Sequence, residues 1–115
     1  MNFKGLLVWQ KSIELAKIVY KITAQFPKSE MYGLASQMQR CSVSISSNIA
    51  EGHGRSHTKE FIQFLGVAYG SCSELETQLI ISKSIYTTID YSLAESFLLE
   101  VQKMLITMIK SLRSK

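Results

Sequence analysis

The sequence predicts an all-α protein, most simply an up-down-up-down four-helix bundle that assembles into an oligomer. Four segments repeat apolar residues at helical spacing, and the connections between them are short. The chain has one proline and six glycines, fewer turn residues than a β-sandwich would need. With 115 residues, 46% hydrophobic and 19% charged, it is expected to form a single folded domain over residues 1-115.

The first predicted helix extends from about Leu6 to Gln25, and Pro27 stops it because proline disfavours helix in the residue before it and lacks an N–H. Two neighbouring apolar stripes follow this helix. One stripe is Trp9, Ile13, Ala16 and Tyr20, and the other is Leu15, Ile18, Ile22 and Phe26.

The second predicted helix begins near Ser29 or Glu30 and continues to about Glu51. Gly52 and Gly54 are expected to end it, since glycine adopts the left-handed conformation that caps helices. One face is apolar, and a neighbouring face of small residues should let another helix come close. The apolar face is Leu34, Met38, Cys41, Ile45 and Ile49, and the small face is Ala35, Ser42, Val43, Ser46 and Ala50.

The third predicted helix, from Thr58 to about Tyr86, has the clearest apolar seam, with the spacing of a heptad repeat. Gly66 and Gly70 lie inside it, and close contact with another helix is expected to offset their low helix propensity. The seam consists of Phe61, Leu65, Ala68, Cys72, Leu75 and Leu79.

The fourth predicted helix begins at Ser92 in a capping-box pattern completed by Glu95. Basic residues crowd its last turn, where the helix dipole favours cations: Lys110, Arg113 and Lys115. Its main apolar line is Leu93, Phe97, Val101, Met104 and Met108, with Leu98, Leu105, Ile109 and Leu112 beside it.

The first and fourth helices are apolar around about half of their circumference, which is wider than the roughly 100° stripe of an ordinary surface helix. Leu99 and Ile106 add a further apolar patch outside the main line. Excess apolar surface of this kind is usually buried between subunits, so we expect a homo-oligomer.

The net charge of +4 is a mild basic bias and does not by itself specify a nucleic-acid partner. Cys41 and Cys72 lie on apolar seams and are interpreted as reduced core residues of a cytoplasmic protein. No targeting segment is recognised, and no apolar run reaches the roughly 20 residues that span a bilayer, so no membrane association is expected.

Residues 44–61, SISSNIAEGHGRSHTKEF, contain the residue types of several catalytic and binding sites. The run from Ser56 to Lys59 matches S-x-x-K, but the downstream elements of that acylation chemistry are missing. His53 and His57 have metal-ligand spacing, yet Gly54 favours a helix break between them and no third His or Cys is near. We therefore predict no catalytic residue and no metal site. A metal bound by the two histidines would instead support a third possibility, a hydrolase or metal enzyme.

The glycines at 52 and 54, followed by Arg55 and a helix, would also suit a phosphate bound by backbone N–H groups. A structural turn is the favoured interpretation, because no Walker pattern and no preceding strand are present. A salt bridge between Glu51 and Arg55 would account for much of the local chemistry.

Several motifs between residues 6 and 86 occur together in register. They include L-V-W-Q-K at 7–11, Phe26-Pro27, Y-G-L at 32–34, S-N-I-A-E-G-H-G-R at 47–55 and E-L-E-T-Q-L at 74–79. With these motifs the chain resembles the 23S rRNA intervening-sequence protein family. It departs from the family pattern at Gln39, which replaces the first residue of an Arg-Arg pair, at Ser46, which replaces a proline, and at His57, which replaces a serine.

The resemblance implies a four-helix bundle that forms a ring-like homopentamer in the bacterial cytoplasm, with no enzymatic activity, no cofactor and an unknown biochemical function. Proteins of similar fold serve retroelements as accessory subunits that bind nucleic acid and a reverse transcriptase.

The leading hypothesis is RNA or DNA binding through a basic surface, because a ring adds together the charge of its subunits. The alternative is a scaffold or accessory subunit that binds a protein partner and has no direct nucleic-acid role. The predicted binding residues are Arg40, Arg55 and Lys59 around the corner between the second and third helices, and Lys11, Lys17 and Lys21 as a second strip. The corner itself is formed by Asn48, Glu51, Gly52 and Gly54.

Overall fold

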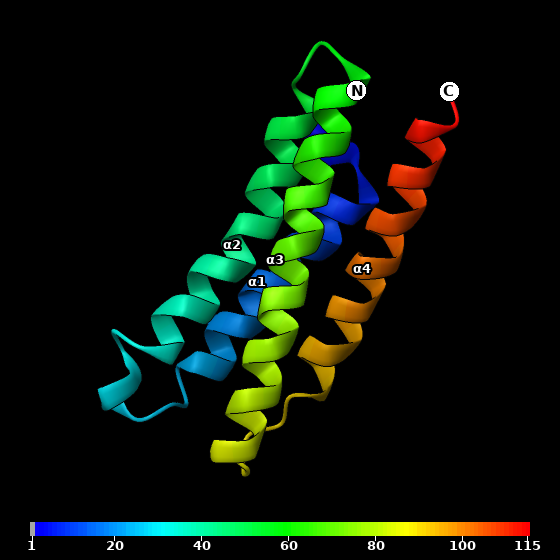
Figure 1. Cartoon of the computed structure of the whole chain (residues 1–115). Helices are drawn as coiled ribbons and strands as arrows, with labels where there is room; N and C mark the ends of the chain where they lie inside the picture. Colours follow the sequence, from blue (N-terminus) through cyan, green and yellow to red (C-terminus); the bar gives the residue numbers. More distant parts are fainter. Residues whose placement is uncertain (1) are drawn as a thin grey trace.

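The computed structural model describes residues 2–115 and confirms the predicted all-α fold, with four long helices and no strand in this part of the chain. They lie side by side in an elongated body of 46 × 21 × 20 Å (Figure 1). Short 3₁₀ turns at Phe3–Gly5 and Lys28–Glu30 precede the first two helices. The helices are α1 (Leu7–Thr23), α2 (Leu34–His53), α3 (Thr58–Ile85) and α4 (Ser92–Arg113).

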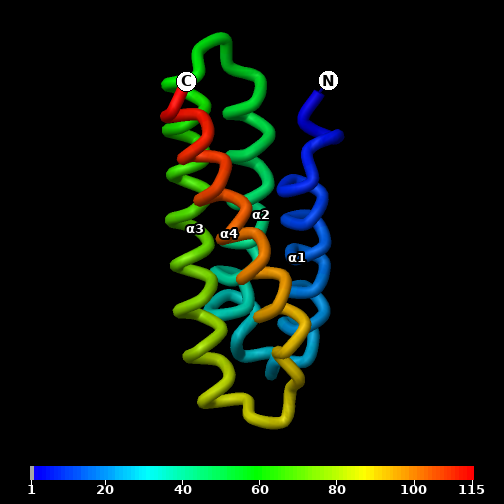
Figure 2. The backbone as a smooth tube through the Cα atoms, turned by 90° about the vertical axis from the view of Figure 1, so that its right-hand side faces the viewer, coloured from blue at the N-terminus to red at the C-terminus, as the bar shows by residue number. Residues whose placement is uncertain are grey.

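Each helix packs against the next one along the chain, and α4 packs against α1. The α1–α2 and α3–α4 connections lie at one end of the molecule. The α2–α3 connection and both termini lie at the other end (Figures 1 and 2). This arrangement brings the charged C-terminal turn of α4 to the same end as the predicted α2–α3 corner.

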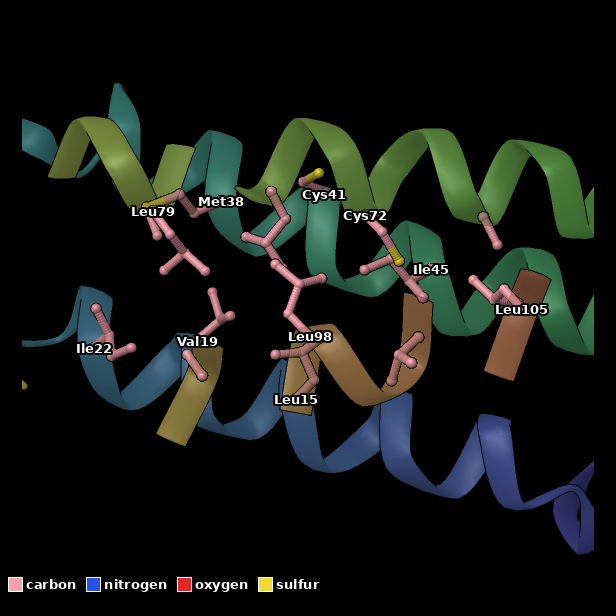
Figure 3. Close-up of a cluster of buried hydrophobic side chains, with 14 of the residues drawn as sticks. Leu15, Val19, Ile22, Met38, Cys41, Ile45, Cys72, Leu79, Leu98 and Leu105 are labelled. Carbon is pink, nitrogen blue, oxygen red and sulfur yellow. The ribbon is translucent and has the colours of Figure 1, made fainter. Parts of the chain in front are cut away.

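One continuous core runs between the four helices (Figure 3). The predicted seam of α3 is confirmed from Leu65 to Leu79, with Phe61 half-buried at its start. The predicted apolar face of α2 is confirmed from Met38 to Ile49. The core residues of the outer helices are Val8, Leu15, Val19 and Ile22 in α1 and Ala94, Leu98, Val101 and Leu105 in α4.

Of the two predicted stripes of α1, the one that begins at Leu15 faces the core, because Leu15, Ile22 and Phe26 are buried. The stripe that begins at Trp9 lies beside it, with Trp9 packed against the edge of the core and Tyr20 exposed. In α4, Leu93 is exposed and the core line instead begins at Ala94. Both helices are apolar around so much of their surface that periodicity alone does not identify the face that points inward.

The small-residue face of α2 lies against α1, as its composition indicates. Ser42 and Ser46 are buried, and each hydroxyl donates to a backbone carbonyl three residues earlier in α2. Gln39, which departs from the family pattern, donates from Nε2 to Thr23 Oγ1 at 3.0 Å. This residue therefore links α2 to α1 and does not contribute charge to a binding surface.

Gly52 does not end α2 through a left-handed conformation, because no glycine in residues 2–115 has a positive φ. It is buried inside the last turn of α2, and Gly54 follows the helix with a φ of −79°. A Cβ at position 52 would lie 2.5 Å from Phe64 Cβ and 3.0 Å from Phe61 Cδ1. The glycine is required by the close approach of α3, which the sequence pattern did not indicate.

Gly66 and Gly70 show the opposite behaviour. A Cβ built at either position meets no atom within 4 Å, so the expected close contact with another helix is absent within this chain. Both residues are exposed on the outer side of α3.

The second helix begins at Leu34, later than predicted, because residues 28–30 form a separate 3₁₀ turn. Glu30 fixes this turn by accepting hydrogen bonds from the backbone N–H of Leu34 and from the Tyr86 hydroxyl beyond the end of α3. The hydrogen bond to Glu30 raises the pKa of Tyr86.

The fourth helix is not capped by a Ser92–Glu95 box. Asp90 Oδ1 accepts hydrogen bonds from the backbone N–H of Ser92 at 2.9 Å and from its hydroxyl at 2.7 Å. Glu95 pairs with Lys83 at 3.2 Å. These hydrogen bonds from Ser92, first of all the one from its backbone, lower the pKa of Asp90 below its ordinary value of 3.8.

Replacing Asp90 should therefore lower stability in a pH-dependent way. Because the pKa of this carboxyl is lower in the folded chain, its contribution is present above the unfolded-state pKa and is lost as pH falls through the folded-state value. We expect Asp90→Ala to melt at a lower temperature than wild type at pH 7, and the two to converge in acid. Asp90→Asn keeps an acceptor oxygen, so its melting temperature at pH 7 should lie between those of wild type and Asp90→Ala. Equal melting temperatures of the three proteins at pH 7 would contradict the role of Asp90 as the cap of α4.

Both cysteines are buried and unpaired core residues, as predicted. Burial raises the pKa of Cys41 and of Cys72 to about 12, which keeps both thiols neutral. Cys41 Sγ donates to the Ser71 carbonyl across the α2–α3 interface at 3.0 Å.

Candidate nucleic-acid interface

The corner between α2 and α3 holds Arg55 in a defined position. Its guanidinium lies 2.8 Å from Glu51 Oε2, which confirms the expected salt bridge, and 4.8 Å from the centre of the Phe64 ring. Both partners are on helices, Glu51 in the last turn of α2 and Phe64 in the second turn of α3. The arginine therefore presents its charge from a fixed site, partly neutralised by Glu51.

The backbone of the corner offers little to a bound phosphate. The N–H of Gly54 donates to the carbonyls of Ala50 and Glu51, and the N–H of Arg55 donates to the carbonyl of Gly52. Two of the amides that a phosphate cradle would use are therefore occupied by the C-terminal carbonyls of α2.

The histidines of this corner occupy different environments. His53 packs edge-on against Phe61, with 5.6 Å between the ring centres, whereas His57 is exposed just before α3. Within residues 2–115, no group of three or more His, Cys, Asp or Glu side chains has the arrangement of a metal site.

Asn48 is linked to the α2–α3 interface through Ser44 of its own helix. Its Nδ2 donates to the carbonyl of Ser44 at 2.8 Å and to the Ser44 hydroxyl at 3.1 Å, and that hydroxyl pairs with Ser71 at 3.0 Å. The amide of Asn48 is therefore engaged within α2, and the bond across to α3 is made by Ser44.

Arg40 is not brought to the corner. It precedes Gly52 by twelve residues, which is about 18 Å along α2 at about 1.5 Å per residue. It lines a polar groove of about 310 Å³ between α2 and α3, together with Gln37 and Glu74.

The three lysines of α1 do not form a single strip. Lys11 points toward α4, where its ammonium lies 3.3 Å from Glu100 Oε2 and 5.1 Å from the centre of the Phe97 ring. Lys17 pairs with Glu14 at 3.1 Å, and Lys21 is exposed one turn further along α1.

A larger concentration of charge lies at the end of the bundle that holds both termini and the α2–α3 connection (Figures 1 and 2). We refer to this end as the basic end. Among the described residues it carries six basic and two acidic side chains, so the remaining seven of each sign cancel and the formal net charge of +4 resides here. The basic residues are Lys4, Arg55, Lys59, Lys110, Arg113 and Lys115, and the acidic residues are Glu51 and Glu60.

Sequence reasoning identified only Arg55 and Lys59 in this group. The cluster at the end of α4 was visible in the sequence but was attributed to the helix dipole. The predicted up-down-up-down order already places the end of the fourth helix beside the α2–α3 corner, but the two clusters of basic residues were not combined.

No helix in the described part of the chain is long and apolar enough to cross a bilayer. Comparison with curated protein sequences gives no significant match. The model of one family, described as 23S rRNA-intervening sequence protein, matches residues 4–107, which is most of the chain. The three basic residues at the end of α4 lie beyond the matched region. The chain therefore belongs to the 23S rRNA-intervening sequence protein family.

Proposed function

We propose that this protein is a non-enzymatic up-down-up-down four-helix bundle that assembles into a ring, a homopentamer by family resemblance, and binds RNA through its basic end in the cytoplasm. The single observation that supports RNA binding is the position of the net charge. All of the formal +4 is at one end of an elongated molecule, while the rest of the chain is neutral.

Concentrated charge matters because binding to a polyanion is governed by the number of phosphates that are neutralised together. Four of the basic residues belong to two neighbouring segments, the α2–α3 connection with the start of α3 and the last turn of α4. If the copies in a ring point the same way, their basic ends lie on one face and their fields add. The family description names an rRNA insert, so structured RNA is the nucleic acid to test first.

The test compares two double charge reversals by fluorescence anisotropy with a labelled RNA hairpin at low salt. Lys59→Glu/Arg113→Glu alters the basic end, and Lys28→Glu/Lys103→Glu makes the same change of charge elsewhere. All four side chains are exposed, so both variants should fold. We expect the first variant to bind at least about tenfold more weakly than wild type, a difference of about 1.4 kcal/mol, and the second to stay within about twofold.

Equal loss in both variants would show that total charge and not the basic end determines binding. Absence of wild-type binding at low salt would contradict the proposed function altogether.

A further inference from the structure

The polar groove between α2 and α3 carries opposite charges that do not pair with each other. Its volume of about 310 Å³ is at the lower end of the range for small-molecule sites. Arg40 lines it from α2 and Glu74 from α3, and neither belongs to an ion pair within residues 2–115. A cation and an anion on neighbouring helices therefore both remain free to bind a third group.

Hydrogen bonds between the two helices fix the floor of this groove. The hydroxyls of Ser44 and Ser71 lie 3.0 Å apart, and Cys41 Sγ donates to the Ser71 carbonyl at 3.0 Å. Glu74 lies close to this floor, because its charge adds to burial, the larger cause, in raising the pKa of Cys41. The groove is thus a fixed part of the α2–α3 interface.

A buried amide near one end of the groove lacks a hydrogen-bond donor. Gln78 is 7% exposed, and its Oε1 accepts no hydrogen bond in the described part of the chain. It follows Ser71 by two turns of α3 and so lies on the same side of that helix. Gln37, which lines the groove, precedes Ser44 by two turns of α2, and α2 runs opposite to α3 (Figure 1), so the two glutamines are at the same level. A ligand that brings an N–H group to Gln78 would remove the cost of an unsatisfied buried acceptor.

These groups suit the chemistry of a free α-amino acid. Its carboxylate would accept two hydrogen bonds from the Arg40 guanidinium, and its ammonium would pair with Glu74. A side-chain amide would supply the N–H group for Gln78 Oε1. None of the residues that line the groove is aromatic, so a nucleobase would find no surface on which to stack.

We propose that the α2–α3 groove binds a free amino acid with an amide side chain, with Arg40 holding its carboxylate and Glu74 its ammonium. The site is separate from the basic end, because Arg40 lies about 18 Å along α2 from Gly52. Amino-acid binding is therefore a further activity that does not depend on RNA binding.

The experiment uses calorimetric titration of the wild-type protein with L-glutamine and with two analogues that each lack one charge. N-acetyl-L-glutamine has no ammonium, and L-glutaminamide has no carboxylate. Wild type should bind L-glutamine at least about tenfold more tightly than either analogue. Arg40→Gln should no longer prefer L-glutamine over L-glutaminamide, and Glu74→Gln should no longer prefer it over N-acetyl-L-glutamine, because each variant lacks the partner of the missing group.

Two substitutions in α1 are the controls for lost charge. Lys21→Gln and Glu14→Gln remove the same charges from exposed positions outside the groove and should bind L-glutamine as wild type does. Circular dichroism verifies that all four variants are folded. Equal weakening by the controls and the groove variants would overturn the inference.

The inference is also overturned if wild type does not bind L-glutamine at about 10 mM, or if guanosine monophosphate binds more tightly than L-glutamine. Anisotropy with the RNA hairpin separates this result from the proposed function. Arg40→Gln should bind RNA within about twofold of wild type, because Arg40 lies away from the basic end. A larger loss of RNA binding in this variant would identify Arg40 as an RNA contact and contradict a separate amino-acid site.

Discussion

Gly52→Ala is expected to destabilise the bundle by about 3 kcal/mol, at the upper end of overpacking effects. The added Cβ would lie 2.5 Å from Phe64 Cβ, an atom fixed to the backbone of α3, so a rotamer change cannot relieve the contact. The two helices must separate at the corner, and the Arg55–Phe64 contact should weaken with them. Urea denaturation followed by circular dichroism measures the loss.

Gly70→Ala is the matched control, because it makes the same chemical change in a helix where nothing lies within 4 Å of the added atom. It should raise stability by about 0.5–1 kcal/mol through helix propensity alone. Equal effects of the two substitutions, or a stabilising Gly52→Ala, would contradict the assigned packing of α2 against α3.

Leu98→Ala is expected to cost about 2–5 kcal/mol, the range for removing a leucine side chain from a packed core. Leu98 is 3% exposed and points into the core between the helices (Figure 3). The loss combines the transfer of apolar surface to water with the cavity that remains.

The neighbouring Leu99→Ala provides the control, since the same deletion one residue later lies on the outer side of α4 with 52% exposure. At protein concentrations low enough to disfavour assembly, its effect should stay within about 0.5 kcal/mol. At high concentration the destabilisation should grow, because assembly stabilises the folded chain by mass action. Equal costs for both variants at low concentration would reverse the assignment of core and outer face in α4.

The fold was predictable from the sequence because its main determinants are local. The spacing from Phe61 to Leu79 identified α3 and its buried face, and Pro27 correctly separated α1 from α2. The inward faces of α1 and α4 were less predictable. A helix with apolar residues around half its circumference fits the core in more than one rotation, and its neighbours select among them.

The roles of the glycines were also beyond local reasoning. The same residue type is required at position 52 by Phe64 and is free of contacts at positions 66 and 70, a difference that appears only when α2 and α3 are packed. Of the predicted binding residues, Arg55 and Lys59 lie at the basic end, whereas Arg40 and the lysines of α1 lie elsewhere along the bundle. The basic end could have been found from the sequence, because the predicted up-down-up-down order places the end of the fourth helix beside the connection between the second and third helices.

The most direct test of the account is the salt dependence of RNA binding by the wild-type protein and by Lys59→Glu/Arg113→Glu. For each protein, the logarithm of the dissociation constant is measured against the logarithm of salt concentration. We expect a steep linear dependence for wild type and a slope smaller by about 2 for the variant, about one for each lost phosphate contact. Identical slopes for the two proteins, or wild-type binding that does not change with salt, would contradict a nucleic-acid interface at the basic end.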